Sequence, residues 1–352
     1  MKKSLLAVAL LGAFAGVAHA QTAVQIYGTV DAGVTKRTDQ TLAIGKRANN
    51  TLGFKGTEDL GNGLKALFQL EIRYEPDTGT IEQGAGGVQR PLFQGQSRVG
   101  LQGDFGMVRL GRGLTAFQES STAFEPWHGL PTPAGFQTDL QVAGYTSDPL
   151  GYAGNSTNRF SNAIFYNSPE VMGFQLNTTV GMKEAFGAAY TGRGTTLLPQ
   201  YPVGTEASVL PYSITGTYKN GPAAMMIANE RNAVEHRLWS IAGSVMAMPD
   251  LKLMASYQRQ NMDHTKPVNP ITKAWILGAN YTMGPGKVLA GYGQKSPDGL
   301  AKVRQASLGY EYSLSKRTYV YADLSNKKGL PVTVPATPGS INTYSLGVNH
   351  AF

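Results

Sequence analysis

The last ten residues, Thr-Tyr-Ser-Leu-Gly-Val-Asn-His-Ala-Phe (343–352), alternate between two kinds of side chain. Small or polar groups occupy one set of positions, and the larger side chains occupy the other: Tyr344, Leu346, Val348, His350 and Phe352. A period of two is typical of a strand with one apolar and one polar face. The segment stops on an aromatic residue, with no tail beyond it. This favours a β-barrel strand with one face toward lipid and the other toward water.

The same alternation recurs along the chain. Segments 24–34, 64–74, 174–182 and 275–283 each place apolar residues on alternate positions. Helical spacing of three and four residues is not sustained after residue 20. The chain therefore belongs to the all-β class, and its apolar residues indicate many half-buried strands.

The connections between these segments alternate in length. Seven are short and rich in turn-forming residues: 59–63, 104–106, 167–171, 220–222, 249–250, 284–286 and 314–317. Eight are longer and polar: 35–50, 75–94, 113–158, 184–210, 231–236, 261–272, 296–301 and 327–340. Fifteen connections predict a 16-stranded antiparallel transmembrane β-barrel with short periplasmic turns and long extracellular loops. Sixteen strands leave an aqueous channel, whereas about eight fill with side chains.

The first twenty residues form a separate segment. Lys2 and Lys3 precede an apolar run from Leu5 to Val17, and Ala18-His19-Ala20 resembles a cleavage site. This pattern predicts a secretory signal peptide over 1–20 and a barrel domain over 21–352. The run is too short for a membrane anchor, and no later segment reaches eighteen consecutive apolar residues.

Composition excludes several function classes. The chain has no cysteine, so it has no disulfides and no thiolate metal site. The net charge is +8, but the basic residues are scattered, which argues against nucleic-acid binding and favours an interior attractive to anions. No motif indicates a cofactor or a metal: Gly61 to Ala66 matches G-x-G-x-x-A, but a period-two segment follows it where a nucleotide site needs a helix.

Catalysis has little support in this sequence. Past the signal segment, the four histidines are His128, His236, His264 and His350. None lies in a motif with a nucleophilic serine or at metal-binding spacing. We therefore expect no enzyme activity, although a triad assembled from distant strands stays open.

The loop at 113–158 is anomalous because it is the longest connection and has no strand of its own. Loops of this length are usually functional or disordered. Its aromatic residues favour a loop that folds into the lumen and packs against the wall: Phe117, Phe124, Trp127, Phe136 and Tyr145. We predict an inward-folded third loop that narrows the channel.

The same alternation predicts which charged side chains point into the lumen, because alternate residues of a strand face opposite sides of the wall. The basic residues with inward parity are Lys55, Lys65, Arg73, Arg98 and Arg109, and those at loop ends of strands are Arg47 and Arg159. Lys65 and Arg109 also suit ordinary solvated positions near the turn end. The long loop carries the acidic residues Glu119, Glu125, Asp139 and Asp148. A basic wall facing an acidic loop predicts a transverse field across a narrow, water-filled gap, which filters solutes by size and sign.

Seven ordered segments resemble the general porins of β-proteobacteria, the family that includes the neisserial porins. They are VQIYGTVDAGV (24–34), LGFKGTEDLGNGLKALFQLE (52–71), SRVGLQGDFGMVRLGR (97–112), RFSNAIFYNSPEVMGFQL (159–176), YKNGP (218–222), LGYEYSLSKRTYVYA (308–322) and GVNHAF (347–352). The resemblance implies a trimeric outer-membrane channel for passive diffusion of small hydrophilic solutes, surrounded by lipid and lipopolysaccharide. It also implies that Phe352 is part of the signal read by the barrel-assembly machinery.

The resemblance also bears on selectivity. Members that favour anions carry a cluster of arginines at the constriction, and Arg159 matches one of them. Three other family positions differ here: Thr51 and Asn349 replace arginines, and Gln96 replaces one member of a basic pair whose other member is Arg98. The chain is therefore expected to show a mild anion preference, with Arg47, Lys55 and Arg73 compensating in part.

Three alternatives to a general diffusion channel stay open. A substrate-specific channel for small anionic solutes would differ only in the constriction. A barrel enzyme would depend on one of the histidines. A soluble periplasmic β-protein would need neither detergent nor a trimer, but the lipid-facing alternation and the terminal Phe352 argue against it.

Overall fold

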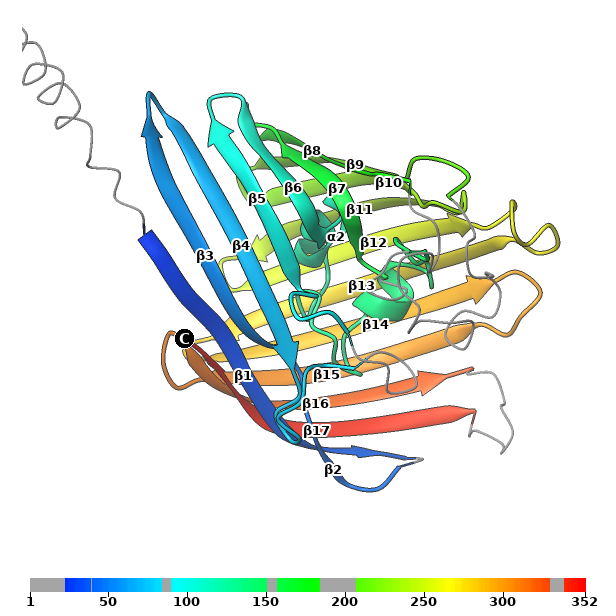
Figure 1. Ribbon diagram of the computed structural model, residues 1–352. Coiled ribbons are helices and arrows are strands. Elements are labelled where there is room, and N and C mark those ends of the chain that lie inside the picture. The colour runs from blue at the N-terminus through cyan, green and yellow to red at the C-terminus, as the bar shows by residue number, and fades with distance from the viewer. Residues whose placement is uncertain (1–22, 39, 84–89, 151–156, 184–206, 330–338) are drawn as a thin grey trace, which may run out of the picture.

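The computed structural model describes residues 23–38, 40–83, 90–150, 157–183, 207–329 and 339–352. Figure 1 shows an open-ended barrel with its helical segments inside. The predicted signal peptide at 1–20 lies outside the described residues. Among the described residues, no helix is long and apolar enough to cross a membrane.

Long antiparallel strands form the wall of the barrel. The strands are β1 (Ala23–Arg37), β2 (Ala43–Gly45), β3 (Asn50–Gly61), β4 (Leu64–Tyr74), β5 (Gln96–Gly103), β6 (Gly106–Leu114), β7 (Arg159–Asn167), β8 (Phe174–Gly181), β9 (Tyr212–Asn220), β10 (Ala223–Arg231), β11 (Arg237–Met248), β12 (Leu251–Asn261), β13 (Ile271–Met283), β14 (Gly286–Pro297), β15 (Val303–Ser313), β16 (Thr318–Lys328) and β17 (Ser340–Ala351). β2 is a three-residue ladder on β1 within the first long loop. The remaining sixteen strands confirm the predicted barrel.

The first and last strands close the barrel. β1 pairs with β17 from Thr29 opposite Ala351 to Arg37 opposite Thr343. The amide of Gly28 donates to the carbonyl of Phe352 at 3.1 Å, and the amide of Phe352 donates back at 3.1 Å. Closure gives the backbone groups of both strands a partner, which a wall surrounded by lipid requires.

The two faces of the wall differ as the alternation predicts. On β1, Val24, Ile26 and Val30 are exposed on the outer surface. On the partner strand β17, Leu346 is exposed while Asn349 is buried on the inner side. The apolar set therefore faces the bilayer and the polar set faces the lumen.

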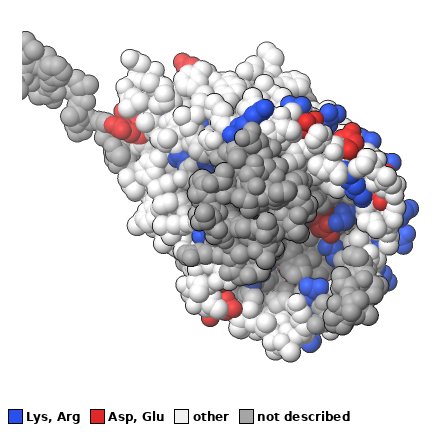
Figure 2. Space-filling model, turned by 45° about the vertical axis from the view of Figure 1, so that its right-hand side comes forward, with Lys and Arg blue, Asp and Glu red and all other residues white. Residues whose placement is uncertain are grey.

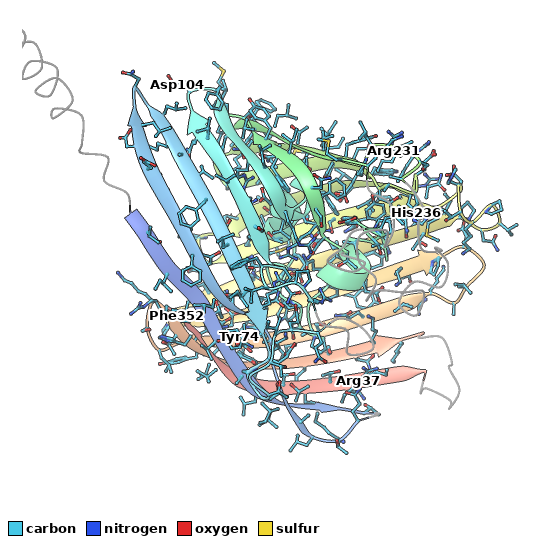
Figure 3. All side chains as sticks on the ribbon, viewed as in Figure 1. Arg37, Tyr74, Asp104, Arg231, His236 and Phe352 are labelled. Carbon is cyan, nitrogen blue, oxygen red and sulfur yellow. The ribbon has the colours of Figure 1, made fainter. Side chains whose placement is uncertain are left out.

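Short turns and long connections lie at opposite ends of the barrel. In the turn after β3, Asn62 and Gly63 have φ of 51° and 78°, as a two-residue hairpin requires. The segment from Gly61 to Ala66, which matches G-x-G-x-x-A, is thus a turn followed by a strand and not the start of a helix. Figure 3 shows Asp104 and Phe352 near the turn end, and Arg231 and His236 near the loop end.

Candidate functional site

The described part of the connection between β6 and β7 lies inside the barrel (Figure 1), where α2 (Ala116–Ser121), η2 (Thr122–Phe124) and η3 (Gln137–Gln141) give it regular structure. Phe117, Phe124 and Tyr145 are buried in one cluster with Met226 of β10 and Leu238 of β11. Both strand residues belong to the inward-facing set. The aromatic residues of the loop therefore pack on the inner wall, as their position in the sequence predicts.

A second cluster fixes the tip of this loop to β13 and β14. Trp127 and Phe136 are buried with Ile276 and Leu289. Two wall glycines make the close approach possible. A Cβ on Gly291 would lie 2.4 Å from Cε2 of Phe136, and one on Gly278 would lie 2.3 Å from Cγ of Pro126. The wall is therefore shaped to receive the loop.

Polar bonds hold the start of the loop to neighbouring strands. The hydroxyl of Thr179 accepts from the Ala116 amide at 3.0 Å, and the hydroxyl of Ser213 accepts from the Phe117 amide at 3.0 Å. Farther along, the side-chain amide of Gln305 donates to the carbonyl of Gly135 at 2.9 Å. The first two bonds satisfy amides in the first turn of α2, which the helix itself cannot satisfy, and the third attaches the loop backbone to β15.

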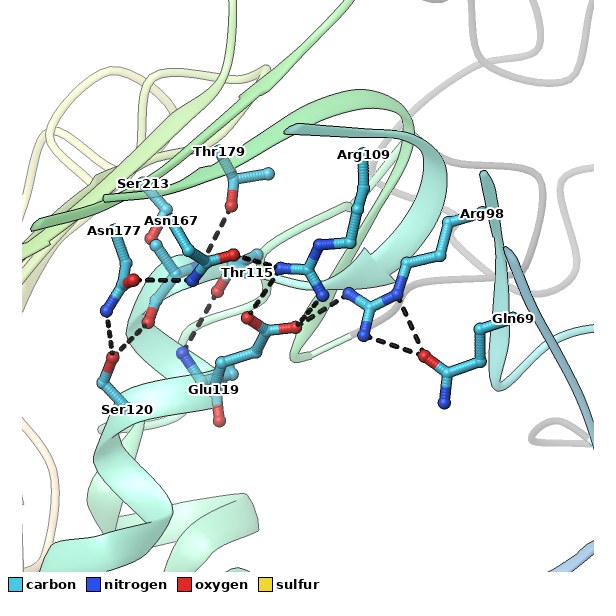
Figure 4. Close-up of polar contacts among 12 residues, drawn as sticks. Gln69, Arg98, Arg109, Thr115, Glu119, Ser120, Asn167, Asn177, Thr179 and Ser213 are labelled. Atoms are coloured by element: carbon cyan, nitrogen blue, oxygen red, sulfur yellow. Dashed lines mark hydrogen bonds and ion pairs between the residues drawn. The ribbon is translucent and has the colours of Figure 1, made fainter. Parts of the chain in front are cut away.

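Glu119 of α2 faces two arginines on the opposite part of the wall (Figure 4). Arg98 Nη1 lies 2.8 Å from Glu119 Oε1, and Arg109 Nη2 lies 3.1 Å from Oε2. Arg98 also donates to the Gln69 side-chain oxygen at 2.9 Å and 3.1 Å. Burial alone would raise the pKa of Glu119, but Arg109 and Arg98 outweigh it and hold that pKa below its ordinary value. Glu119 is therefore ionised at neutral pH.

This contact corrects one part of the sequence-based picture. We expected acid and base to face each other across water, but Glu119 touches both arginines directly. The three groups together carry one net positive charge, because one carboxylate offsets one of two guanidiniums. The loop is thereby tied to β5 and β6 as well as to the far wall.

A hollow of about 390 Å³ opens beside the two arginines. Its inward-facing polar lining comes from Gln25, Lys55, Gln69, Arg98 and Arg109. The Lys55 ammonium lies 5.1 Å from the centre of the Tyr27 ring, which keeps this cation over an aromatic face. Three cations on one hollow create a positive potential on this side of the lumen.

Arg73 and Arg159 lie toward the loop end of the same wall. Arg73 Nε is 3.6 Å from the Glu71 carboxylate. Arg159 Nε donates to the Gly95 carbonyl at 2.7 Å, and its Nη1 donates to Asn158 at 2.7 Å. Arg159 is therefore held in place by backbone and amide oxygens.

Arg47, in contrast, lies in the first long loop and is fully buried against the inner wall. Its guanidinium lies 2.9 Å from Asp323 and 2.6 Å from Glu311, over the ring of Tyr321. The indole of Trp127 donates to Asp323 at 3.0 Å. Arg47 thus joins the first long loop, the inner wall and the third loop, and its charge is compensated by two carboxylates.

The other acids of the long loop also anchor it. Asp139 pairs with Lys295 and, at 2.7 Å, with Lys327. Asp148 accepts from the Ser161 amide at 3.2 Å. These carboxylates bond the wall or the base of the loop and so fix its position.

Glu125 lies within the loop itself. Its carboxylate accepts from the amides of Gly129 and Phe136 at 2.8 Å and 3.0 Å. Burial raises the pKa of Glu125 to about 7, although these amide bonds act in the opposite direction. The side chain is fully buried, so it does not face the lumen.

Asn349 occupies a position at which the family resemblance implies an arginine. It forms a hydrogen bond from β17 to β1, where the barrel closes. Its side-chain amide donates to Asp31 at 2.8 Å, and the Tyr321 hydroxyl donates to the same carboxylate at 2.9 Å. The polar residue at this position therefore stabilises closure of the barrel.

Sequence reasoning missed a set of inward charges on the second half of the barrel: Lys252, Lys287, Lys295, Glu311, Asp323 and Lys327. Lys252 donates to the Ala123 carbonyl at 2.7 Å, and Lys287 lies 2.5 Å from Glu311. The signal was present, because each residue alternates with lipid-facing neighbours on its strand.

No metal-binding group of three or more His, Cys, Asp and Glu side chains occurs in the described part of the chain. His236 bonds the hydroxyl of Thr265, and His128 contacts the amide of Asn280. These contacts give both histidines structural partners.

Known proteins resemble this chain over its whole length. A family model described as "Gram-negative porin" matches residues 7–329. "Outer membrane porin protein 32" of Delftia acidovorans is 34% identical, with 100% of both chains covered. "Major outer membrane protein P.IB" of Neisseria lactamica is 27% identical over the same full extent. A solved "Anion-selective porin from Comamonas acidovorans" is 25% identical, with a TM-score of 0.73 over 94% of this chain and 100% of that one.

Proposed function

Because the chain belongs to the Gram-negative porin family, we propose that small hydrophilic solutes diffuse passively past the Glu119–arginine contact. The protein is a diffusion channel of the bacterial outer membrane. Family and fold indicate a channel rather than an enzyme. The observation that carries the proposal is the third loop packed inside a closed barrel, with Arg98 and Arg109 on the wall it faces.

We infer that residues 113–158 form the constriction. Two apolar clusters and the Asp139 ion pairs attach the loop to β10, β11, β13, β14 and β16. Solutes then pass between the loop and the opposite side of the lumen, along β3 to β6, where the hollow beside Lys55, Arg98 and Arg109 lies. Passage needs no bound cofactor and no moving gate.

The charges on this path support a mild anion preference. Lys55 and the partly compensated arginine pair leave an excess of positive charge on the hollow. Arg47 contributes little to this potential, because two carboxylates compensate it. A relative whose name describes it as anion-selective supports the same sign.

The assembly proposals rest on family membership. We propose that residues 1–20 are cleaved on export and that the mature chain forms a homotrimer, as a trimeric form is named among proteins of this fold. Phe352, exposed beside Gly28 on the outer surface, is accessible as a signal for the barrel-assembly machinery. The apolar outer face suits contact with outer-membrane lipid and lipopolysaccharide.

Single-channel recording in a planar bilayer under a salt gradient tests this proposal. Conductance in threefold steps with a reversal potential on the anion side is the expected result. A cation-side potential would contradict the charge assignment. Saturation or competition by one anionic solute at low concentration would favour a substrate-specific channel. Folded, heat-modifiable protein without conductance would overturn the open-channel proposal.

Partial deletion within 120–150 tests the constriction separately. The shortened loop should raise conductance and weaken selectivity, because the attached segment no longer occupies the lumen. If both quantities stay unchanged, the loop is not the constriction.

A further inference from the structure

The hollow beside Lys55 and the arginine pair has an apolar part that passive diffusion of hydrophilic solutes does not require. Two of its lining residues, Leu67 of β4 and Met107 of β6, are large and apolar. Both occupy inward positions, because Leu67 alternates in step with Gln69 and Met107 in step with Arg109. Positions that face a water-filled lumen are usually polar. These two side chains therefore call for an explanation.

Packing of the third loop does not explain them. Inward apolar residues beneath that loop, such as Leu238, Ile276 and Leu289, are almost fully buried. Leu67 and Met107, in contrast, are only half-buried. They belong to neither of the two apolar clusters that attach the loop to the wall. Their remaining surface borders the hollow.

The strand register brings the two apolar residues to the same part of the wall. Leu67 lies opposite Gly100 of β5, and Gly100 lies opposite Arg109. A Cβ on Gly100 would lie 2.9 Å from Cγ of Arg109, so the stem of this arginine lies close over the glycine. Met107 lies opposite Gln102, the next inward residue of β5. Leu67 and Met107 thus flank β5 from its two neighbours.

The polar groups form a row next to this apolar part. Lys55, Gln69 and Arg98 occupy directly opposed positions on β3, β4 and β5. This row lies one inward position closer to the loop end than Leu67. Figure 4 shows Arg109, Arg98 and Gln69 in line along the wall. A solute that arrives from the loop end therefore meets the cations first and the apolar residues next.

The hollow keeps an excess of positive charge. Glu119 offsets one of the two arginines. Among the described residues, Lys55 has an aromatic partner, Tyr27, and no carboxylate partner. Three cations and one carboxylate leave two positive charges. Figure 2, which brings the loop end forward, shows Lys and Arg gathered along one edge of that end, which also attracts anions toward the lumen.

We propose that this hollow is a weak binding subsite for small carboxylates with an apolar body, of which benzoate is a simple example. The carboxylate bonds Lys55 and Arg98, and the apolar body packs against Leu67 and Met107. Charge-assisted hydrogen bonds are the strong contacts of a carboxylate. A hollow of about 390 Å³ is within the range of small-molecule sites, which combine apolar walls with a few polar groups. The inference rests on the proposed function, because solutes must pass along β3 to β6.

Such a subsite must release its ligand for the channel to conduct. Benzoate has about nine non-hydrogen atoms, and ordinary ligand efficiency gives a dissociation constant on the order of 10 mM. Carboxylates of this class are therefore held briefly and then pass, while other hydrophilic solutes still diffuse through the same lumen.

Single-channel recording of the purified full-length protein in KCl at neutral pH tests the subsite. Benzoate, benzamide and acetate are added at equal concentrations, and brief current interruptions give the affinity of each. Benzamide keeps the ring without the charge, and acetate keeps the carboxylate without the ring. Benzoate should bind at least about tenfold more tightly than either. Equal binding of benzamide would overturn carboxylate recognition, and equal binding of acetate would overturn apolar recognition.

Substitutions then locate the subsite. Leu67→Asn and Met107→Gln replace the apolar groups with polar ones of similar size, and each should weaken benzoate binding roughly three- to fivefold. Met246→Gln is the matched control, because Met246 faces the lumen opposite Lys252 of β12 and is 39% exposed. This control should bind benzoate as the unmodified protein does. Lys55→Gln should weaken binding of benzoate and leave that of benzamide unchanged.

The outcomes separate this subsite from the channel itself. Unchanged benzoate affinity in both Leu67→Asn and Met107→Gln, or an equal loss in Met246→Gln, would overturn the location. Normal KCl conductance of the unmodified protein with no effect of benzoate would overturn the subsite alone. Absence of KCl conductance would overturn the channel and the subsite together.

Discussion

Glu119→Gln should make the channel more selective for anions. The substitution keeps the size of the side chain and an oxygen that can accept from Arg98 or Arg109, but it removes the charge that offsets one of them. The arginines also keep their bonds to Gln69 and Asn167, so they stay in place. The net charge of the group then rises from one positive charge to two.

The expected change follows from Coulomb's law and salt screening. At about 7 Å in a water-filled lumen, one unit charge acts on a passing monovalent ion with about 0.6 kcal/mol. Salt at about 0.1 M, with a Debye length of about 10 Å, reduces this to about 0.3 kcal/mol. Loss of the carboxylate favours an anion and disfavours a cation by the same amount. The anion-to-cation permeability ratio should therefore rise about threefold, and about fivefold near 0.01 M salt.

Reversal potentials across a salt gradient, at both mean salt concentrations, measure this ratio. Glu170→Gln is the matched control, because Glu170 is exposed in the turn between β7 and β8. The control should leave the ratio unchanged. An unchanged or lower ratio for Glu119→Gln would refute the reasoning, as would a gain that does not grow at low salt. A large rise in conductance would show instead that the loop has detached from β5 and β6.

Three further perturbations test the packing of the third loop. Asp323→Ala leaves the buried Arg47 guanidinium without one partner, and it should lower the stability of the barrel by roughly 3–5 kcal/mol, seen as a lower unfolding temperature. The pKa of Glu125, about 7, lies above its ordinary value of 4.5, so its ionisation costs stability as pH rises between these values. Hydrogen exchange at the Phe136 amide should therefore show a loop more stable at pH 4.5 than above pH 7, by roughly 3 kcal/mol. Gly291→Ala introduces a Cβ 2.4 Å from Phe136, and it should push the loop into the lumen and lower single-channel conductance.

Two of these have a matched control variant. Glu125→Gln removes the titrating group and should abolish the pH dependence of loop exchange; persistence of that dependence would assign it elsewhere. In Gly243→Ala the new Cβ would lie 3.8 Å from the Ala224 carbonyl oxygen, an ordinary contact, and conductance should stay unchanged. Unaltered stability in Asp323→Ala would mean that Glu311 alone compensates Arg47.

The wall of the barrel was predictable because lipid and water impose a strict requirement on alternate residues. A strand such as β17 must place Leu346 outward and Asn349 inward, and its sequence shows the period directly. Turns were predictable for a related reason, since a two-residue hairpin demands residues that tolerate positive φ, such as Asn62 and Gly63. Strand number then follows from counting connections.

The site was predictable only in part. Parity predicts an inward position for Arg98, because the residue lies on a regular strand, and in the structure Arg98 pairs with Glu119 of the third loop. No period governs the third loop, so its sequence could not distinguish Glu119, which reaches the arginines, from Glu125, which bonds the loop backbone. The ion-pair partners of Arg47 could not be predicted from the sequence either, because Asp323 lies 276 residues away along the chain.

The bonds between Gly28 and Phe352 also constrain how the molecule is made. They join residues that lie nearly as far apart in sequence as the chain allows. Closure of the barrel therefore costs much conformational entropy and comes late in folding. Until then, the first and last strands present open edges, which associate readily with other chains. A polypeptide shortened by its final strand keeps those edges permanently and cannot satisfy them in lipid. The barrel can therefore close only after the last strand has been synthesised. Until then, other proteins must cover the open strand edges.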